Sequence, residues 1–296
     1  RAQALIAQGR EPEALSLLKK AEGEGFGDPR LSLLTGTILM QQKNITAALP
    51  YLEEAYADLP YDPEAPASLG KAVAARGLYE EALTFYEESA KIDGNNPDVW
   101  VAIAYLSSRL GRYDEAIKAL DYPLSLSPTD SKLLNAKAYA LYLSGRGHEG
   151  RTMAEEVLRR FPGDPGAMDT LGCILLSEGD TAGATRYLEQ AADLLPDDPE
   201  VLTHLADVYR LTEREKEAQD LYQRSTLIDP TYGRTWRGYS EVLLSLERYP
   251  EVAEAIAETY QYYPGDPDLI AWEKTADKIL LDWYQKGETE RTIRSG

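Results

Sequence analysis

Two helical patterns of apolar and polar positions recur along the chain with a period of 34 residues. A pentapeptide that ends in proline marks the junction between units, as LPYDP, FPGDP, LPDDP and YPGDP. A small residue stands at the eighth position of a unit and, in most copies, at the twentieth, one in each predicted helix. Small residues there let the two helices of a hairpin approach closely. Seven units run from Pro29 to Asp266 without an insertion or deletion, so the pattern predicts an all-α chain of helix hairpins.

The residues between these patterns predict where each helix begins and ends. An Asp or Asn before the first helical residue, as in Asp28-Pro29, accepts a hydrogen bond from a free backbone N–H, and proline suits the first helical turn. A second proline near the end of a unit stops the second helix. Pro123 stands inside one second helix, which we therefore expect to end early or bend. The predicted turn positions between the helices are Gly9, Lys43, Gly77, Gly111, Gly145, Gly179, Glu213 and Glu247.

These units resemble the tetratricopeptide repeat family, whose 34-residue signature is W-x2-L-G-x2-Y followed by A, F and P. Leu69-Gly70, Leu171-Gly172 and Trp100 occupy first-helix signature positions, and Ala82 and Tyr86 occupy second-helix positions. The resemblance covers nearly the whole chain. It implies a right-handed α-α superhelical solenoid of helix-turn-helix repeats.

The ends of the chain fit the same frame. Residues 1–28 are interpreted as a partial N-terminal repeat, and residues 29–266 as seven tetratricopeptide repeats. An apolar stripe of helical period predicts a capping helix over 267–286, which covers the open face of the last repeat. Residues 287–296 form a polar tail. We therefore expect one continuous solenoid domain.

Composition narrows the classes of partner. The chain has 31 Lys and Arg against 50 Asp and Glu, a formal net charge of −19. Binding to a nucleic-acid backbone needs clustered cations, so we expect no nucleic-acid partner. The charge also argues against adsorption to anionic lipid. No segment approaches the ~18 apolar residues that span a bilayer, so we expect no membrane span.

Few side chains could carry metal or catalytic chemistry. Cys173 is the one cysteine, and His148 and His204 are the two histidines, which excludes a disulfide and a site of several thiolates. Cys173 and His204 lie in neighbouring repeats at positions that can face the same groove. A Cys–His nucleophile also needs an orienting group and an oxyanion site, which a solenoid does not readily supply. We expect both side chains to line the groove, and we expect no enzyme, no cofactor and no metal.

The resemblance implies that five positions of each first helix line a concave surface. At these positions Tyr105, Tyr139 and Tyr142 form an aromatic patch, and tyrosine and arginine are enriched at binding hot spots. The alternative is that these rings only cover exposed helix. The predicted partner-binding residues are Tyr105, Arg109, Lys132, Asn135, Tyr139, Tyr142, Asp169, Cys173, Asp207, Arg210 and Arg237.

The sequence favours a protein-protein interaction scaffold that binds a peptide or helical segment of a partner in this groove. The fifth and ninth positions do not reproduce the carboxylate clamp of chaperone-binding relatives, which disfavours a chaperone-tail adaptor. The alternative function is a ligand-binding or transport-accessory protein of the bacterial cell envelope. A first residue other than Met slightly favours the envelope or periplasm over the cytoplasm. The oligomeric state stays open.

Overall fold

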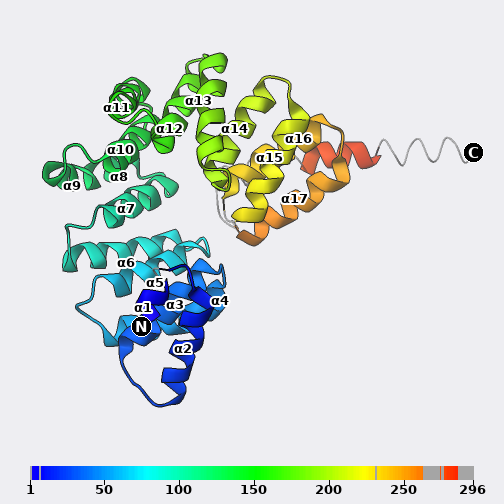
Figure 1. Ribbon diagram of the computed structural model, residues 1–296. Coiled ribbons are helices and arrows are strands. Elements are labelled where there is room, and N and C mark those ends of the chain that lie inside the picture. Colours follow the sequence, from blue (N-terminus) through cyan, green and yellow to red (C-terminus); the bar gives the residue numbers. More distant parts are fainter. Residues whose placement is uncertain (1, 7, 231, 263–273, 275–276, 286–296) are drawn as a thin grey trace, which may run out of the picture. The chain divides into compact units, whose positions relative to one another are not determined.

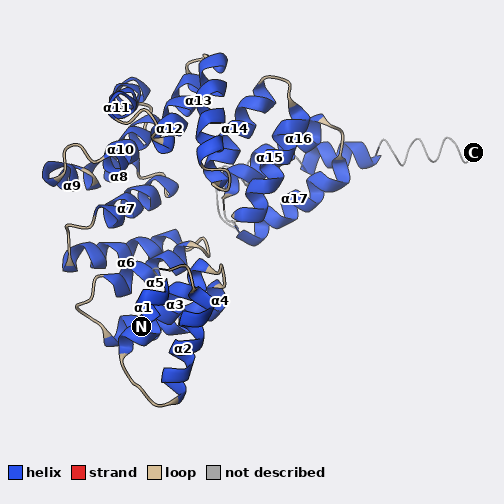
Figure 2. Ribbon diagram, viewed as in Figure 1, coloured by secondary structure: helices blue, strands red, loops and turns tan. Residues whose placement is uncertain are grey.

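The computed structural model describes residues 2–6, 8–230, 232–262, 274 and 277–285. These residues form helices joined by short turns, and no strand occurs among them (Figure 1, Figure 2). The all-α prediction is therefore confirmed. None of the helices in this part of the chain has the length and apolar character needed to cross a membrane.

The chain contains two compact units, residues 1–153 and 154–296. Within each unit, helices that follow one another in sequence pack against each other as hairpins, which is the arrangement that the repeat pattern predicts. The prediction of one continuous solenoid domain stays a prediction. In the first unit the helices are α1 (Ala2–Ile6), α2 (Glu11–Gly23), α3 (Pro29–Gln41), α4 (Ile45–Asp58), α5 (Glu64–Ala74), α6 (Tyr79–Ile92), α7 (Pro97–Arg109), α8 (Tyr113–Ala119), α9 (Asp121–Leu126) and α10 (Ser131–Leu143).

Helix α11 (Gly147–Arg160) contains the boundary between the two units. The helices after it alternate between first and second helices of a repeat, as in the first unit. They are α12 (Pro165–Ser177), α13 (Thr181–Leu194), α14 (Pro199–Leu211), α15 (Glu215–Ile228), α16 (Gly233–Ser245) and α17 (Tyr249–Tyr262).

The predicted caps form at the start of the first helices. The Asp28 carboxylate accepts a hydrogen bond from the backbone N–H of Arg30 at 3.0 Å. The Asn96 side chain accepts one from Asp98 at the same distance. Each cap satisfies an N–H group that the helix itself leaves without an acceptor. The equivalent residues that also accept such bonds are Asp62, Asp130, Asp164 and Asp198.

All eight predicted turn positions have a positive φ angle. The five glycines lie between 67° and 86°, while Lys43, Glu213 and Glu247 lie at 59°, 60° and 57°. A side chain in this left-handed region costs roughly 1–2 kcal/mol. The packing of the hairpin therefore determines the turn conformation. Lys43, Glu213 and Glu247 adopt the same positive φ as the glycines, although this conformation is unfavourable for a residue with a side chain.

The eighth position of the repeat is small because the second helix passes very close to it. A Cβ atom added at Gly36 would lie 2.6 Å from Leu52 Cδ2, and one added at Gly172 would lie 2.5 Å from Leu188 Cγ. Both distances are far shorter than a normal carbon–carbon contact of about 3.5–4.0 Å. The close approach predicted for the hairpins is confirmed at these two positions.

The second helix that contains Pro123 is interrupted, as predicted. Helix α8 ends at Ala119 and α9 begins at Asp121, so Leu120 stands at the break. Proline at 123 has no N–H to donate back to residue 119, which removes one bond of the helical ladder. The Tyr122 ring of α9 lies 5.8 Å from the Trp100 ring, whose Nε1–H donates to the Gly94 carbonyl at 2.8 Å.

The last core cluster of the second unit lies between α16 and α17. Its buried members include Trp236, Leu243 and Val252, and Leu280 packs against them. Residues 277–285 are helical, and Trp283 stacks on Tyr249 with ring centroids 5.2 Å apart. The rest of the predicted capping segment, apart from residue 274, and the predicted polar tail at 287–296 lie outside the described residues.

Candidate functional site

In the first unit, Arg109 at the end of α7 contacts two tyrosines, Tyr105 on the same helix and Tyr79 at the start of α6. Its guanidinium donates to the Tyr105 hydroxyl at 3.0 Å and to the Tyr79 hydroxyl at 2.6 Å. The same group stands 4.8 Å from the centre of the Tyr79 ring, which adds a cation–π attraction. Tyr105 and Arg109 are half-buried. Tyr79 begins a second helix and was not among the predicted binding residues, so its part in this group was missed.

The neighbouring first helix, α10, carries the remaining predicted residues of this unit. The rings of Tyr139 and Tyr142 lie 6.0 Å apart and are inclined at 42°. Asn135 has a buried Oδ1 atom with no hydrogen-bond partner among the described residues. Lys132 is exposed and forms an ion pair with Asp98 at 2.7 Å. Helices α7 and α10 pack against each other, so the two groups of tyrosines stand on adjacent helices.

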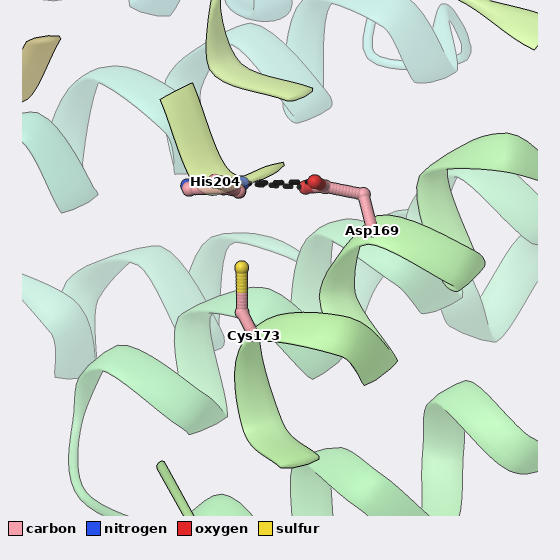
Figure 3. Close-up of side chains that lie close together, drawn as sticks. All are labelled: Asp169, Cys173 and His204. Atoms are coloured by element: carbon pink, nitrogen blue, oxygen red, sulfur yellow. Dashed lines mark hydrogen bonds and ion pairs between the residues drawn. The ribbon is translucent and has the colours of Figure 1, made fainter. Parts of the chain in front are cut away.

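In the second unit, the first-helix face carries a buried group of three polar side chains. Asp169 and Cys173 stand one turn apart on α12, and His204 comes from α14 (Figure 3). The Asp169 carboxylate lies 2.9 and 3.0 Å from His204 Nδ1, and the Cys173 thiol points toward the imidazole. All three residues are at least nine-tenths buried. On the other side of the ring, the Tyr232 hydroxyl lies 3.4 Å from Nε2.

The charges in this group follow from burial and from the Asp169 carboxylate. Burial by itself lowers the pKa of His204, but Asp169, helped by Cys173 and Tyr232, raises it well above its ordinary value. Burial raises the pKa of the Cys173 thiol, and the effect of His204 in the opposite direction is smaller. The raised pKa of His204 favours its protonated form beside the Asp169 carboxylate, and the raised pKa of Cys173 favours the neutral thiol. A cysteine nucleophile needs a thiolate, so this arrangement does not favour attack by sulfur.

A second buried group surrounds Asp207 on α14. One carboxylate oxygen accepts a hydrogen bond from the Tyr222 hydroxyl at 2.5 Å. The other accepts two from the Arg234 guanidinium, at 3.0 and 2.6 Å. Burial raises the pKa of Asp207, but Arg234 and Tyr222 together outweigh it, so that the pKa falls below its ordinary value. Asp207 is therefore ionised and paired rather than available as a proton donor.

The two remaining predicted residues share one carboxylate. Arg210 on α14 and Arg237 on α16 lie 3.2 Å from the two oxygens of Glu241. The Arg210 Nε atom is buried and has no hydrogen-bond partner among the described residues, whereas Arg237 is half-exposed. The sequence placed these residues on one face of neighbouring helices, and the structure adds that Glu241 joins them.

The partners of the predicted residues were partly missed. Tyr222 was not among the predicted binding residues; it is fully buried, and its hydroxyl donates to Asp207. A polar partner for Tyr222 could have been expected from the sequence, because a buried tyrosine usually has a hydrogen-bond partner for its O–H group. A hydroxyl cluster was also missed, in which Thr203 lies 3.0 Å from Ser225 and 2.6 Å from Thr235.

Comparison with known protein families identifies the family of this chain. Models described as tetratricopeptide repeat match residues 1–63, 39–106, 73–138 and 175–238, which together cover well over half of the chain. The chain belongs to the tetratricopeptide repeat family. The resemblance inferred from the 34-residue period is thereby confirmed.

Curated tetratricopeptide proteins similar to the chain are mostly longer. The chain is 27% identical over 215 residues to Tetratricopeptide repeat protein 21A of Mus musculus, a match that covers 64% of this chain and 16% of that protein. It is 22% identical over 224 residues to TPR repeat-containing protein YpiA of Bacillus subtilis (strain 168), covering 75% of this chain and 53% of that protein. The chain thus spans about one sixth of the first relative and about half of the second.

Solved tetratricopeptide structures share the fold. Cut9, in the crystal structure of the APC/C hetero-tetramer Cut9-Hcn1, superposes with a TM-score of 0.61 at 15% identity, over 93% of this chain and 54% of that chain. Yeast Tom70 superposes with a TM-score of 0.59 at 18% identity, over 98% of this chain and 63% of that chain. Identities this low show the fold alone.

Proposed function

We propose that this chain is a protein-protein interaction scaffold, and that the first-helix face of α7 and α10 binds a peptide or helical segment of a partner protein. The observation that carries the proposal is the set of half-buried tyrosines on α7 and α10, which also carry Arg109 and Asn135. Membership of the tetratricopeptide family supports it. So does one solved neighbour, the hetero-tetramer Cut9-Hcn1, in which a chain of this fold is assembled with another protein.

The side chains of this face suit the recognition of a polypeptide. Tyrosine gives a large contact area at a low cost in conformational entropy, and arginine is enriched with it at hot spots. The hydroxyls of Tyr79 and Tyr105 already hold Arg109 in place. Arg109 therefore loses less conformational freedom when a partner binds its guanidinium.

Asn135 adds an acceptor that a polypeptide could use. Its Oδ1 is buried without a partner among the described residues, and a buried unsatisfied polar atom costs about 1–3 kcal/mol. A rotation of the amide would bring the oxygen to the surface, where a backbone N–H of a bound segment would satisfy it and recover part of that cost. We therefore place the main-chain contact of the partner beside Asn135, with the tyrosine rings holding its side chains.

Site-specific photo-crosslinking tests this proposal. A photoreactive residue replaces Tyr139 in one version of the chain and Tyr61 in a control, because Tyr61 is highly exposed and lies in the loop after α4. The peptide trapped at position 139 is identified and synthesised, and its affinity is measured for the wild type, for the triple variant Tyr105→Ala/Tyr139→Ala/Tyr142→Ala and for Tyr61→Ala.

We expect the triple variant to bind at least about 30-fold more weakly, the loss of one hot spot of about 2 kcal/mol. Tyr61→Ala should bind like the wild type. Equal trapping at both positions, or equal affinity of the triple variant with an unchanged far-UV circular dichroism spectrum, would contradict the proposal.

A further inference from the structure

Asp169, Cys173 and His204 bring three different kinds of metal ligand together in the second unit. One ligand atom from each residue can be chosen such that all three lie within 4.8 Å of one another. We infer that these residues form a binding site for a divalent transition-metal ion, with zinc as the best match. The inference is independent of the proposed function, because it rests on other residues of the chain.

The distances are close to those of a formed site. Zinc bonds of about 2.3 Å to sulfur and about 2.0–2.2 Å to nitrogen and oxygen place tetrahedral ligand atoms about 3.3–3.8 Å apart. The Asp169 oxygens already lie 2.9 and 3.0 Å from His204 Nδ1. An ion therefore needs shifts of roughly 1 Å or less in side chains that already point toward one another (Figure 3).

The three ligand residues stand on two regular helices, α12 and α14. Asp169 and Cys173 are four residues apart on α12, so their side chains lie on the same face of that helix. His204 stands on α14, the equivalent helix of the next repeat, which packs against α12. Two ligands from one helical turn and a third from a neighbouring helix make a compact site that needs no rearrangement of a loop.

The ligand charges match a divalent ion. The Asp169 carboxylate and the Cys173 thiolate would balance a doubly charged ion, with neutral imidazole as the third ligand, because metal ligands bind in their deprotonated forms. Outside the site, Asp207 and Arg234 neutralise each other through their own ion pair.

The chemical types of the three ligands favour zinc over magnesium and calcium. Thiolate and imidazole are preferred by zinc and its neighbours among the transition metals, while magnesium and calcium prefer oxygen ligands. Three protein ligands leave the fourth tetrahedral position for water. The Tyr232 hydroxyl, which lies 3.4 Å from His204 Nε2, borders the site.

Cobalt(II) is a direct probe, since it enters zinc sites and absorbs light when bound to a thiolate. The full chain is treated with a chelator, dialysed and titrated with Co²⁺. Because Cys173 is the one cysteine in the chain, a sulfur-to-cobalt charge-transfer band reports this site and needs no variant. We expect the band to saturate at one equivalent of Co²⁺ and to disappear when Zn²⁺ is added. No band at several equivalents would overturn the inference.

Substitutions locate the ion. Cys173→Ser and His204→Gln should each weaken zinc binding at least 10-fold, measured by competition with a chromophoric chelator. His148→Gln is the matched control, because His148 is exposed on α11, and it should bind like the wild type. Zinc should raise the thermal midpoint of the wild type and of the control more than that of Cys173→Ser. Full affinity in both site variants would place the ion elsewhere and overturn the inference.

Discussion

The Asp207 carboxylate accepts two hydrogen bonds from the Arg234 guanidinium, at 3.0 and 2.6 Å, and so joins α14 to α16. The other carboxylate oxygen accepts a hydrogen bond from the hydroxyl of the fully buried Tyr222 on α15. One side chain thus connects three consecutive helices. In the first unit, the Asp98–Lys132 pair joins α7 to α10 at the surface, with both side chains about two-thirds exposed.

We expect Asp207→Ala to lower the free energy of unfolding by about 3 kcal/mol. The substitution leaves the Tyr222 hydroxyl without its acceptor and Arg234 without its counter-ion, and breaking a buried pair on one side costs about 3–5 kcal/mol. Because Arg234 is partly exposed, the lower end of that range applies. Urea denaturation followed by circular dichroism measures the change. Lys132→Ala is the control and should cost less than about 1 kcal/mol, as exposed pairs do; equal losses in the two variants would refute the expectation.

The stability of the second unit should fall in acid partly through Asp207. The pKa of Asp207 in the folded chain is lowered. Its full contribution to the free energy of unfolding is therefore present above the carboxyl pKa of the unfolded chain, about 3.9. The contribution is lost as the pH falls through the folded pKa, since the unfolded chain then binds the proton more readily. Urea denaturation between pH 6 and pH 3 should show a steeper loss of stability for the wild type than for Asp207→Asn. Parallel curves would show that Asp207 does not contribute.

Gly172→Ala should destabilise the α12–α13 hairpin by about 1–3 kcal/mol, the usual cost of overpacking. The new Cβ would lie 2.5 Å from Leu188 Cγ, so one helix must move. A smaller partner should relieve the clash, and Gly172→Ala combined with Leu188→Ala should cost less than the sum of the single changes. The control is Gly163→Ala, where a Cβ meets no atom within 4 Å and the change should stay within about 0.5 kcal/mol. Strict additivity of the two changes would count against a clash between them.

Opposite substitutions at equivalent turns should have opposite effects. Glu213 has a φ of 60° and Gly179 a φ of 86°. Glu213→Gly removes the strain of the left-handed conformation, which should raise the free energy of unfolding by about 1–2 kcal/mol. The greater flexibility of glycine in the unfolded chain offsets about 0.5–1 kcal/mol of this gain. We therefore expect a net stabilisation of about 0.5–1 kcal/mol, and a destabilisation of similar size for Gly179→Ala. Thermal and urea unfolding measure both, and a change of the same sign in the two variants would rule out this explanation.

The helices, caps and turns could be predicted because each one depends on residues close in sequence. Asp28 caps α3 through an N–H two residues away, and Pro123 interrupts the helix in which it stands. A repeat of fixed length then carries such local signals through the whole chain. This is why Lys43 could be assigned to a turn although it is not a glycine.

The contacts within the candidate sites could not be predicted in the same way. The repeat placed Asp169, Cys173 and Asp207 on one face, but the partner of Asp169 is His204, one residue further along than the period of 34. Which side chains meet depends on their length and on how neighbouring first helices are inclined. The period does not contain that information. For the same reason, Arg109 was predicted as a binding residue, but its contact with Tyr79 from the preceding second helix was not.

The break at Leu120 makes one repeat easier to open than its neighbours. Helix α9 has six residues, too few to be stable without packing, and Tyr122 and Leu126 on it are about half-exposed. Its backbone amides should therefore exchange with deuterium faster than those of α6. Such an opening would separate the Tyr122 ring from the ring of Trp100, while Ile103 and Leu106 of α7 belong to a core cluster with residues of α3 to α6. The repeat thus contains a segment that can unfold locally while the rest of the repeat keeps its structure.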